Sequence, residues 1–199
     1  MYTLIGSPKT RAFRVLWMLE ELGLEYELKP EPPQSEGILK YNPSGKVPAV
    51  LADGSTLLDS VAIIQFLADN HGKFTFPAGT IERAKQDSFT QFAVDELEGP
   101  CWNFAKHSFI LPKELRTPDA KPAFRYDFEK SLTVFEKRLG DRQYVMGDDF
   151  TIADLVIGHI AGWAKNCKFE WPEGPVGEYF EHVRSRPAFL KAWEIREAD

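Results

Sequence analysis

The spacing of apolar residues changes along the chain, and the change predicts two regions of different architecture. Near the N-terminus, short β-prone runs alternate with stretches in which apolar residues recur every three or four positions, as on one face of a helix. Glycine-containing turns separate these runs, and Asp53-Gly54 has the sequence of a hairpin turn. The predicted elements, in chain order, are strand 2–5, helix 10–22, strand 26–28, strand 47–51, strand 56–58 and helix 59–71.

Strand signals nearly vanish in the second half of the chain, whereas helical periodicity continues. Apolar residues recur at helical spacing from Phe128 to Leu139. Thr151 and Asp154 have the spacing of a capping box, and Pro187 suits the first turn of a last helix. This half of the chain is therefore expected to be all-helical.

The two patterns predict two domains joined by a short linker. We expect a mixed α/β domain over residues 1–75, in which the order strand, helix, strand indicates a parallel pair. Residues 76–82 carry Pro and Gly and are predicted to form the linker. Residues 83–199 are predicted to form the all-helical domain.

Composition narrows the expected partners and compartment. The formal net charge is -6, and an acidic chain has no general attraction for nucleic acid or an anionic membrane, so neither is expected as a partner. Two cysteines, Cys101 and Cys167, imply no disulfide framework and suit a reducing compartment. With neither a signal-peptide pattern nor a long apolar run, a cytoplasmic location is expected. The histidines are scattered, so no metal site is expected.

Three short motifs in the first region can carry chemistry, and each also has a plainer structural role. A cis bond at Val47-Pro48 would turn the backbone of Val47 outward to pair with an extended peptide, whereas a trans bond would simply begin a strand. Asp59-Ser60 begins a helix whose free N–H groups attract an anion, or it is only an N-cap. The hydroxyl of Ser7 can stabilise a thiolate or merely form a turn.

The order and spacing of these motifs resemble the cytosolic glutathione transferase family over essentially the whole chain. The stretches that carry the resemblance are GSPKTRAFRVLWMLEELGLEYEL, NPSGKVPAVLADGSTLLDSVAIIQFL, DDFTIADL and RSRPAF. The resemblance implies an N-terminal thioredoxin-like βαβαββα domain, a C-terminal all-helical domain and a homodimer. It also implies that glutathione is the co-substrate.

The resemblance assigns glutathione-binding roles by position. Val47 would pair with the peptide backbone of glutathione beside a cis Pro48. Asp59 and Ser60 would hold the γ-glutamyl group, and Lys46 would reach the glycine carboxylate. Asp59 stands where Glu or Gln is usual in the family, so its contact with the ammonium group is expected to be shorter or to pass through water.

The same resemblance points to a hydroxyl as the catalytic group. Ser7, four residues before Arg11, matches the serine-type, bacterial-like members, in which the hydroxyl stabilises the thiolate. Thr10 is a second nearby hydroxyl and stays a candidate for this role. The first strand ends without the Tyr of tyrosine-type members, and the turn lacks the Cys of cysteine-type members. Lowering the thiol pKa by one unit needs about 1.4 kcal/mol, which one hydrogen bond to a charged group supplies.

Four residues of the second region are candidates for a second-substrate pocket. Trp102, Phe104 and His107 fall on a helix that lines this pocket in the family, and Trp163 can join them, although each also suits a plain helical core. The predicted function is conjugation of the glutathione thiolate to an electrophilic, mostly apolar molecule. A non-enzymatic binding or scaffold module and a glutathione-dependent peroxidase stay open as alternatives.

Overall fold

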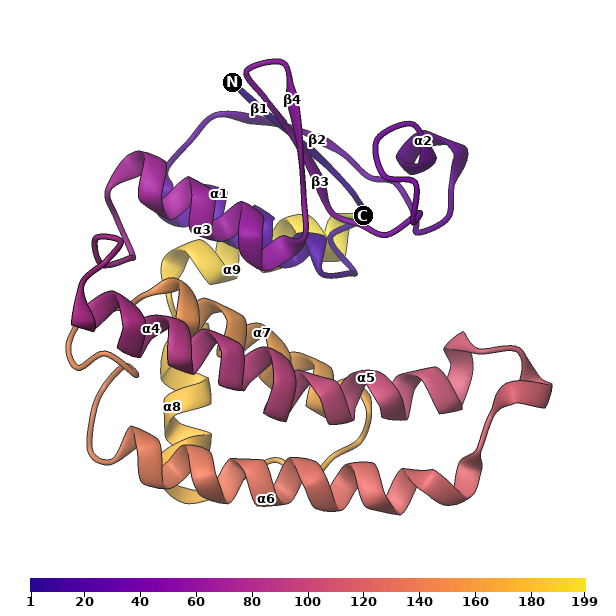
Figure 1. The fold of residues 1–199 in the computed structure, drawn as a ribbon, viewed down its shortest axis with the longest axis vertical. Helices are drawn as coiled ribbons and strands as arrows, with labels where there is room; N and C mark the ends of the chain where they lie inside the picture. The colour runs from indigo at the N-terminus through magenta and orange to yellow at the C-terminus, as the bar shows by residue number, and fades with distance from the viewer. The chain divides into compact units, whose positions relative to one another are not determined.

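The computed structural model describes all of residues 1–199 and divides them into two compact units. The first unit joins Met1–Pro77 to the C-terminal segment Arg184–Asp199, and the second comprises Ala78–Val183. Figure 1 shows the sheet in the first unit and only helices in the second, so the predicted fold class is confirmed.

The first unit is built on a four-stranded sheet in the order β2-β1-β3-β4. Its strands are β1 (Tyr2–Ile5), β2 (Tyr26–Lys29), β3 (Ala49–Ala52) and β4 (Ser55–Leu58). β1 and β2 are parallel, as the strand–helix–strand pattern predicts, whereas β3 is antiparallel to both of its neighbours. Because β3 runs opposite to β1, the start of β3 lies beside the end of β1.

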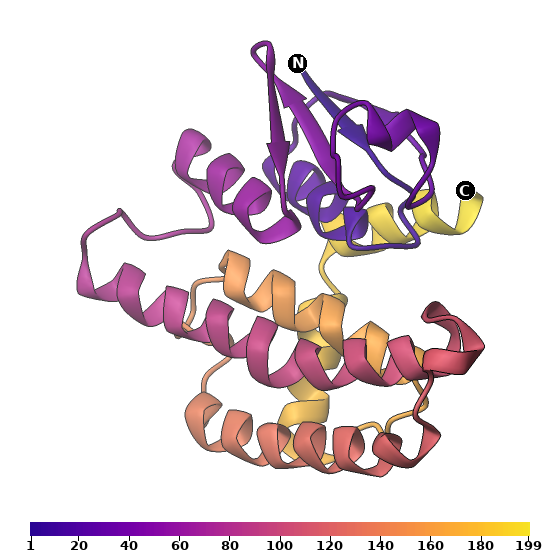
Figure 2. The ribbon, with the colours of Figure 1, turned by 45° about the vertical axis from the view of Figure 1, so that its right-hand side comes forward.

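Four helices complete this unit: α1 (Ala12–Leu22), α2 (Glu36–Leu39), α3 (Ser60–His71) and α9 (Pro187–Ala198). Figure 2 shows α1 and α3 on the same face of the sheet. Both end at a left-handed glycine, as the sequence predicts. In α3, Phe66 is 36% exposed while Ile64 is buried, so not every apolar side chain of this helix lies on its covered face.

Helix α1 is buried on all sides rather than on one face. Every residue from Ala12 to Leu19 is buried, although the apolar period predicts a single stripe. The reason is that α1 contacts three other elements of its unit, namely the sheet, α3 and α9. A helix with this many neighbours has no face left for solvent along most of its length.

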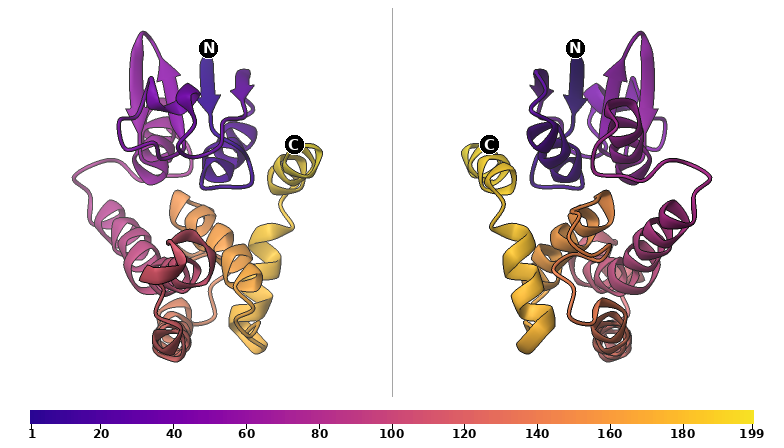
Figure 3. Two further views of the ribbon diagram at one scale, coloured as in Figure 1. Left: turned by 90° about the vertical axis from the view of Figure 1, so that its right-hand side faces the viewer. Right: turned by 90° about the vertical axis from the view of Figure 1, so that its left-hand side faces the viewer.

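The C-terminal helix α9 belongs with the sheet unit, which differs from the predicted domain of residues 83–199. Figure 3 shows α9 lying alongside α1. Phe13 and Trp17 of α1 make edge contacts with Phe189, at ring distances of 5.4 and 4.9 Å, and Phe13 also meets Trp193. Aromatic packing of this kind, made between residues far apart in sequence, leaves no signature in the local pattern.

Charged contacts also hold α9 against α1. The buried carboxylate of Glu21 accepts two hydrogen bonds from Arg186, at 2.6 and 2.7 Å, and a third from the Trp17 indole at 2.9 Å. The ammonium group of Lys191 lies 2.6 Å from a carboxylate oxygen of Glu20, but the lysine is mostly exposed. The bidentate pair is therefore expected to contribute more than the exposed one.

Replacement Glu21→Ala is expected to lower the free energy of unfolding by about 1–3 kcal/mol, because it removes the acceptor of three hydrogen bonds. Lys191→Ala, the matched control on the other α1–α9 ion pair, should change stability by less than about 1 kcal/mol. Urea unfolding measures both, and amide hydrogen exchange in α9 shows whether this helix opens first. Equal effects of the two substitutions would contradict the ranking.

The second unit contains helices of three kinds. Its elements are α4 (Ile81–Phe92), the π-helical turn η1 (Ala93–Glu98), α5 (Gly99–Ala105), the π-helical turn η2 (Lys106–Ile110), the short 3₁₀ turns η3 (Lys113–Leu115) and η4 (Pro118–Ala120), α6 (Lys121–Leu139), α7 (Ile152–Asn166) and α8 (Gly174–Arg184). Figure 1 shows α6 running beside α5 in this unit. No helix has both the length and the apolar composition needed to cross a membrane.

Helix α7 is buried from Ile152 to Ala161, and its start matches the predicted capping box. The Thr151 side chain caps the N3 backbone, and the Asp154 side chain bonds back to the Thr151 backbone. Phe150 and Leu155 occupy the two positions of a hydrophobic staple at this helix start, and both are buried. The start of this helix is therefore fixed by local sequence.

Candidate functional site

The carboxyl end of β1 meets the segment before β3. Ile5 pairs with Ala49, so the residues just after Ile5 lie next to those just before Ala49. Gly6 has φ 139°, and a Cβ added to it would lie 2.9 Å from the Cβ of Val47. Only glycine allows this backbone conformation and this close approach. The turn that carries Ser7 is therefore held directly against Val47.

The Val47–Pro48 peptide bond is cis, as the resemblance implies. Pro48 is buried, whereas Val47 is half-buried and precedes the first paired residue of β3. No hydrogen bond engages the backbone N–H or C=O of Val47 in the structure. Both groups are thus available to a ligand with an extended backbone.

The loop before Val47 is fixed by Asn42, a residue for which the sequence predicts no role. The buried Asn42 side chain donates to the Lys46 carbonyl at 2.8 Å, and its oxygen accepts from the backbone N–H and the hydroxyl of Ser44. The Lys46 side chain is exposed. The backbone of Lys46 is thus held while its ammonium group stays at the surface.

The buried Ser60 lies at the first position of α3 and contacts a buried arginine. Arg14 of α1 donates to the Ser60 hydroxyl oxygen at 3.2 Å. The hydroxyl proton of Ser60 is then directed away from the guanidinium. Arg14 belongs to none of the motifs, although a single charged residue within the apolar run of α1 is the signal that could have identified it.

Asp59 is the N-cap of α3. Its carboxylate oxygen Oδ1 accepts from the backbone N–H groups of Val61 at 2.9 Å and Ala62 at 3.3 Å. Its backbone has φ 69° and ψ 124°, an unusual conformation that residues adopt where surrounding structure imposes it. One carboxylate oxygen therefore has the ordinary capping role.

The structure distinguishes the two candidate hydroxyls. Thr10 donates to the Ser7 carbonyl at 2.7 Å and accepts from the Ala12 N–H at 3.1 Å, so its hydroxyl is used within the turn. The Ser7 hydroxyl donates instead to a carboxylate oxygen of Asp199 at 2.8 Å. Arg11 occupies the N-cap position of α1, in the same turn.

The four candidate pocket residues fall into two groups within the second unit. Trp102 and Trp163 stack, with ring centroids 5.8 Å apart. His107 stacks on Phe124 of α6, and Phe104 packs edge-on against another ring. The structure therefore does not bring all four together, because neighbouring positions on α5 point to different faces of the helix.

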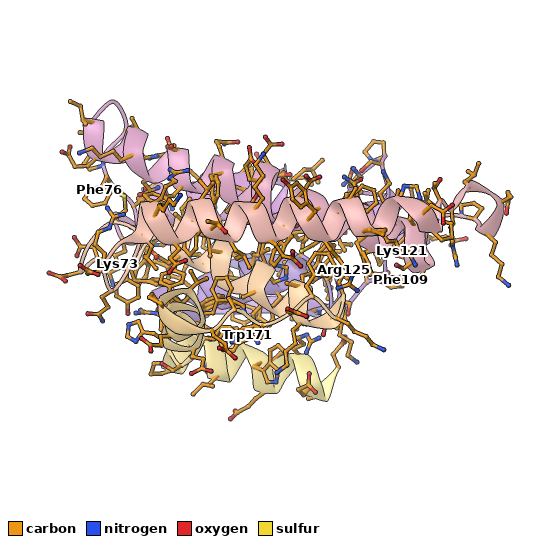
Figure 4. All side chains as sticks on the ribbon, turned by 90° about the horizontal axis from the view of Figure 1, so that it is seen from below. Lys73, Phe76, Phe109, Lys121, Arg125 and Trp171 are labelled. Atoms are coloured by element: carbon orange, nitrogen blue, oxygen red, sulfur yellow. The ribbon has the colours of Figure 1, made fainter.

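The ring of Phe104 is covered by cations from α6. Its partner ring is Phe169, and the Arg125 guanidinium lies 4.7 and 4.9 Å from the two ring centroids. Lys121 lies over Phe104 at 5.4 Å. Figure 4 labels Arg125 and Lys121 near the same end of α6. These cation–π contacts assign Phe104 to the packing of the helical unit.

The two cysteines are buried thiols in the second unit. Cys167 Sγ lies 3.8 Å from the Cys101 carbonyl oxygen. Burial raises the pKa of both thiols, so both stay protonated near neutral pH. Neither has the features of a nucleophile, and both fit a structural role.

Comparison with known proteins places both units in one family. Residues 10–70 match the model of the glutathione S-transferase N-terminal domain, and residues 118–196 match that of the C-terminal domain. Glutathione S-transferase GstA of Escherichia coli O157:H7 is 32% identical over 155 residues, which cover 73% of this chain and 71% of that protein.

Two further proteins extend the similarity to nearly the whole chain. Glutathione S-transferase F13 of Arabidopsis thaliana is 30% identical over 196 residues, which are 89% of this chain and 88% of that one. The glutathione transferase URE2P6 of Phanerochaete chrysosporium, solved with oxidized glutathione, is 26% identical, has a TM-score of 0.82 and covers 99% of this chain and 96% of its own. The chain therefore belongs to the glutathione S-transferase family.

Proposed function

We propose that this protein binds glutathione along one edge of its first unit and conjugates the thiolate to an electrophilic, mostly apolar small molecule. Membership of the family makes it a glutathione transferase. The observation that supports the location is that Ala49 pairs with both Ile5 and Leu58, so the segment with Val47 lies beside the turn of Ser7 after β1 and beside the start of α3 after β4.

The free backbone of Val47 would pair with the central peptide unit of glutathione. This pairing resembles the addition of a short strand, in which main-chain hydrogen bonds supply much of the affinity. The solved relative with oxidized glutathione supports the choice of ligand. The exposed ammonium group of Lys46, just before Val47, would meet the glycine carboxylate.

The γ-glutamyl end of glutathione would lie at the start of α3. The Ser60 N–H and hydroxyl would donate to the carboxylate, favoured by the helix dipole and by the Arg14 cation behind the hydroxyl. Asp59 uses Oδ1 for capping, which leaves Oδ2 to meet the ammonium group. Its short side chain is consistent with a water-mediated contact.

Catalysis in this proposal rests on the thiolate rather than on a protein nucleophile. The Ser7 hydroxyl donates to the sulfur, and the thiol proton passes to solvent. The thiolate then forms a bond to the electrophilic carbon of the second substrate and displaces its leaving group. Positioning and stabilisation of the sulfur anion account for the rate gain, and no metal takes part.

The contact with the second substrate, the oligomeric state and the location are proposed in less detail. The Trp102–Trp163 stack is the better candidate for contact with an apolar substrate, because Phe104 and His107 are used in packing against α6. A homodimer and a cytoplasmic location are proposed because the chain belongs to this family.

The proposed binding mode is tested by retention on immobilised glutathione, followed by a conjugation assay with chlorodinitrobenzene. Retention without conjugation would favour the non-enzymatic alternative, and activity on an organic peroxide alone would favour the peroxidase.

Replacement Ser60→Ala is expected to weaken glutathione binding about tenfold, because it removes one hydrogen bond to a buried carboxylate, worth about 1.5 kcal/mol. Isothermal titration with glutathione measures the change. The exposed Ser55 of β4 offers a matched control, Ser55→Ala, which should bind like the parent protein. Unchanged binding in Ser60→Ala would place the γ-glutamyl group elsewhere.

A further inference from the structure

The single proton of the Ser7 hydroxyl is already engaged in the structure. The Ser7 oxygen accepts from the Lys9 backbone N–H at 3.2 Å and donates to Asp199 Oδ2 at 2.8 Å. A hydroxyl has only one proton to donate. We propose that the Asp199 carboxylate competes with the glutathione sulfur for this proton and restrains thiolate formation, an inference that rests on the proposed function.

The position of Asp199 is determined by the docking of a whole helix. Asp199 directly follows α9, which is held on α1 by the Glu21–Arg186 pair and by aromatic contacts of Phe189. The carboxylate therefore reaches Ser7 from a packed element of the same unit. Because the hydrogen bond is exposed, solvent and substrate also have access to it.

Other charged groups lie on the segments that make or adjoin this contact. Lys9 is exposed in the same turn, and Arg11 begins α1. Glu31, whose carbonyl accepts from the Ser7 N–H, has its carboxylate bonded to Ser35. On α9 itself, Arg196 pairs with Glu197. Asp199 is the carboxylate among these that shares a hydrogen bond with the Ser7 hydroxyl.

Two physical effects act in the same direction. When the Ser7 hydroxyl donates its hydrogen bond to Asp199, it cannot donate to the sulfur. The negative charge of Asp199 near the sulfur also opposes the formation of a second negative charge on the sulfur. The pKa of the bound thiol is therefore higher than Ser7 alone would set. Approach of the thiolate must turn the hydroxyl from Asp199 to the sulfur, while the thiol proton goes to solvent.

The test is the pair Asp199→Asn and Glu194→Gln. Both remove one negative charge from the same C-terminal segment, but Glu194 is exposed and has no contact with Ser7. The readouts are the pH dependence of kcat/KM for conjugation of glutathione with chlorodinitrobenzene and the ultraviolet absorbance of the bound thiolate. Neither substitution changes a buried group, so both variants should fold.

We expect Asp199→Asn to lower the pH midpoint of thiolate formation by roughly half to one unit, which raises kcat/KM about three- to tenfold below that midpoint. Glu194→Gln should leave the profile in place. In a Ser7→Ala background, Asp199→Asn should have a clearly smaller effect, because the shared proton is gone.

Other outcomes separate this inference from the proposed function. An unchanged or raised midpoint in Asp199→Asn, with Ser7→Ala still impaired, would overturn the inference alone, and a raised midpoint would mean that Asp199 assists the reaction. Full activity in Ser7→Ala, or failure of the parent protein to bind glutathione, would overturn the proposed function itself.

Discussion

Replacement Ser7→Ala is expected to lower kcat/KM for conjugation about 10- to 100-fold near neutral pH. The substitution removes the proposed hydrogen-bond donor to the thiolate, which should raise the pKa of bound glutathione by about one to two units. The loss should shrink at high pH, where the thiol ionises without help. Steady-state kinetics over a pH series, together with titration of the thiolate absorbance, measure both effects.

Two further expected results make Ser7→Ala a decisive test. Binding of glutathione should persist, because Val47 and Ser60 are untouched. Thr10→Val is the matched comparison, and it should cost about 1 kcal/mol of stability but less activity than Ser7→Ala, since the Thr10 hydroxyl is used inside the turn. A larger activity loss in Thr10→Val would move the catalytic role to Thr10.

The second large effect is expected in the helical unit, where Asp154→Ala should lower the free energy of unfolding by about 4–5 kcal/mol. The buried carboxylate accepts four hydrogen bonds, from the Val145 N–H, the Tyr179 hydroxyl, and the N–H and hydroxyl of Thr151. Burial raises the pKa of Asp154, and these donors act in the opposite direction. Removing the acceptor leaves several buried donors unpaired.

Two controls distinguish the buried network from a general loss of charge. Tyr179→Phe removes one of the four donors and should cost about 1–2 kcal/mol. Asp149→Ala, at an exposed carboxylate close in sequence, should change stability by less than about 0.5 kcal/mol. Urea denaturation followed by far-ultraviolet circular dichroism compares the three. The interpretation fails if Asp154→Ala costs no more than Tyr179→Phe.

Elements whose signals are local were predicted within a few residues. The strand Tyr2–Ile5, the left-handed end of α1 at Gly23 and the capping box of α7 all agree with the sequence pattern. Each depends on side chains within one or two turns of one another. The pattern could not predict which helix faces are covered, and so the all-round burial of α1 differs from the single apolar stripe expected.

Some features of the candidate site could likewise be predicted from the sequence, and others could not. Its motif residues Ser7, Val47 and Ser60 could be named from spacing and resemblance, but their roles stay predictions. Their proximity depends on the antiparallel registers of β3 with β1 and with β4, in which Ala49 pairs with Ile5 and with Leu58. Trp102 and Phe104 lie close together in sequence yet contact different partners, because each position on a helix points in its own direction.

The sequence by itself determined the family resemblance, the two-part architecture and the positions of the motifs, because these depend on short periodic patterns and on residue order. The tertiary structure alone decided that α9 packs on α1, that Arg14 contacts Ser60 and that Asp199 contacts Ser7. Each of these joins residues from distant parts of the chain, and such contacts are fixed by the packing of whole elements, for which a local pattern carries no signal.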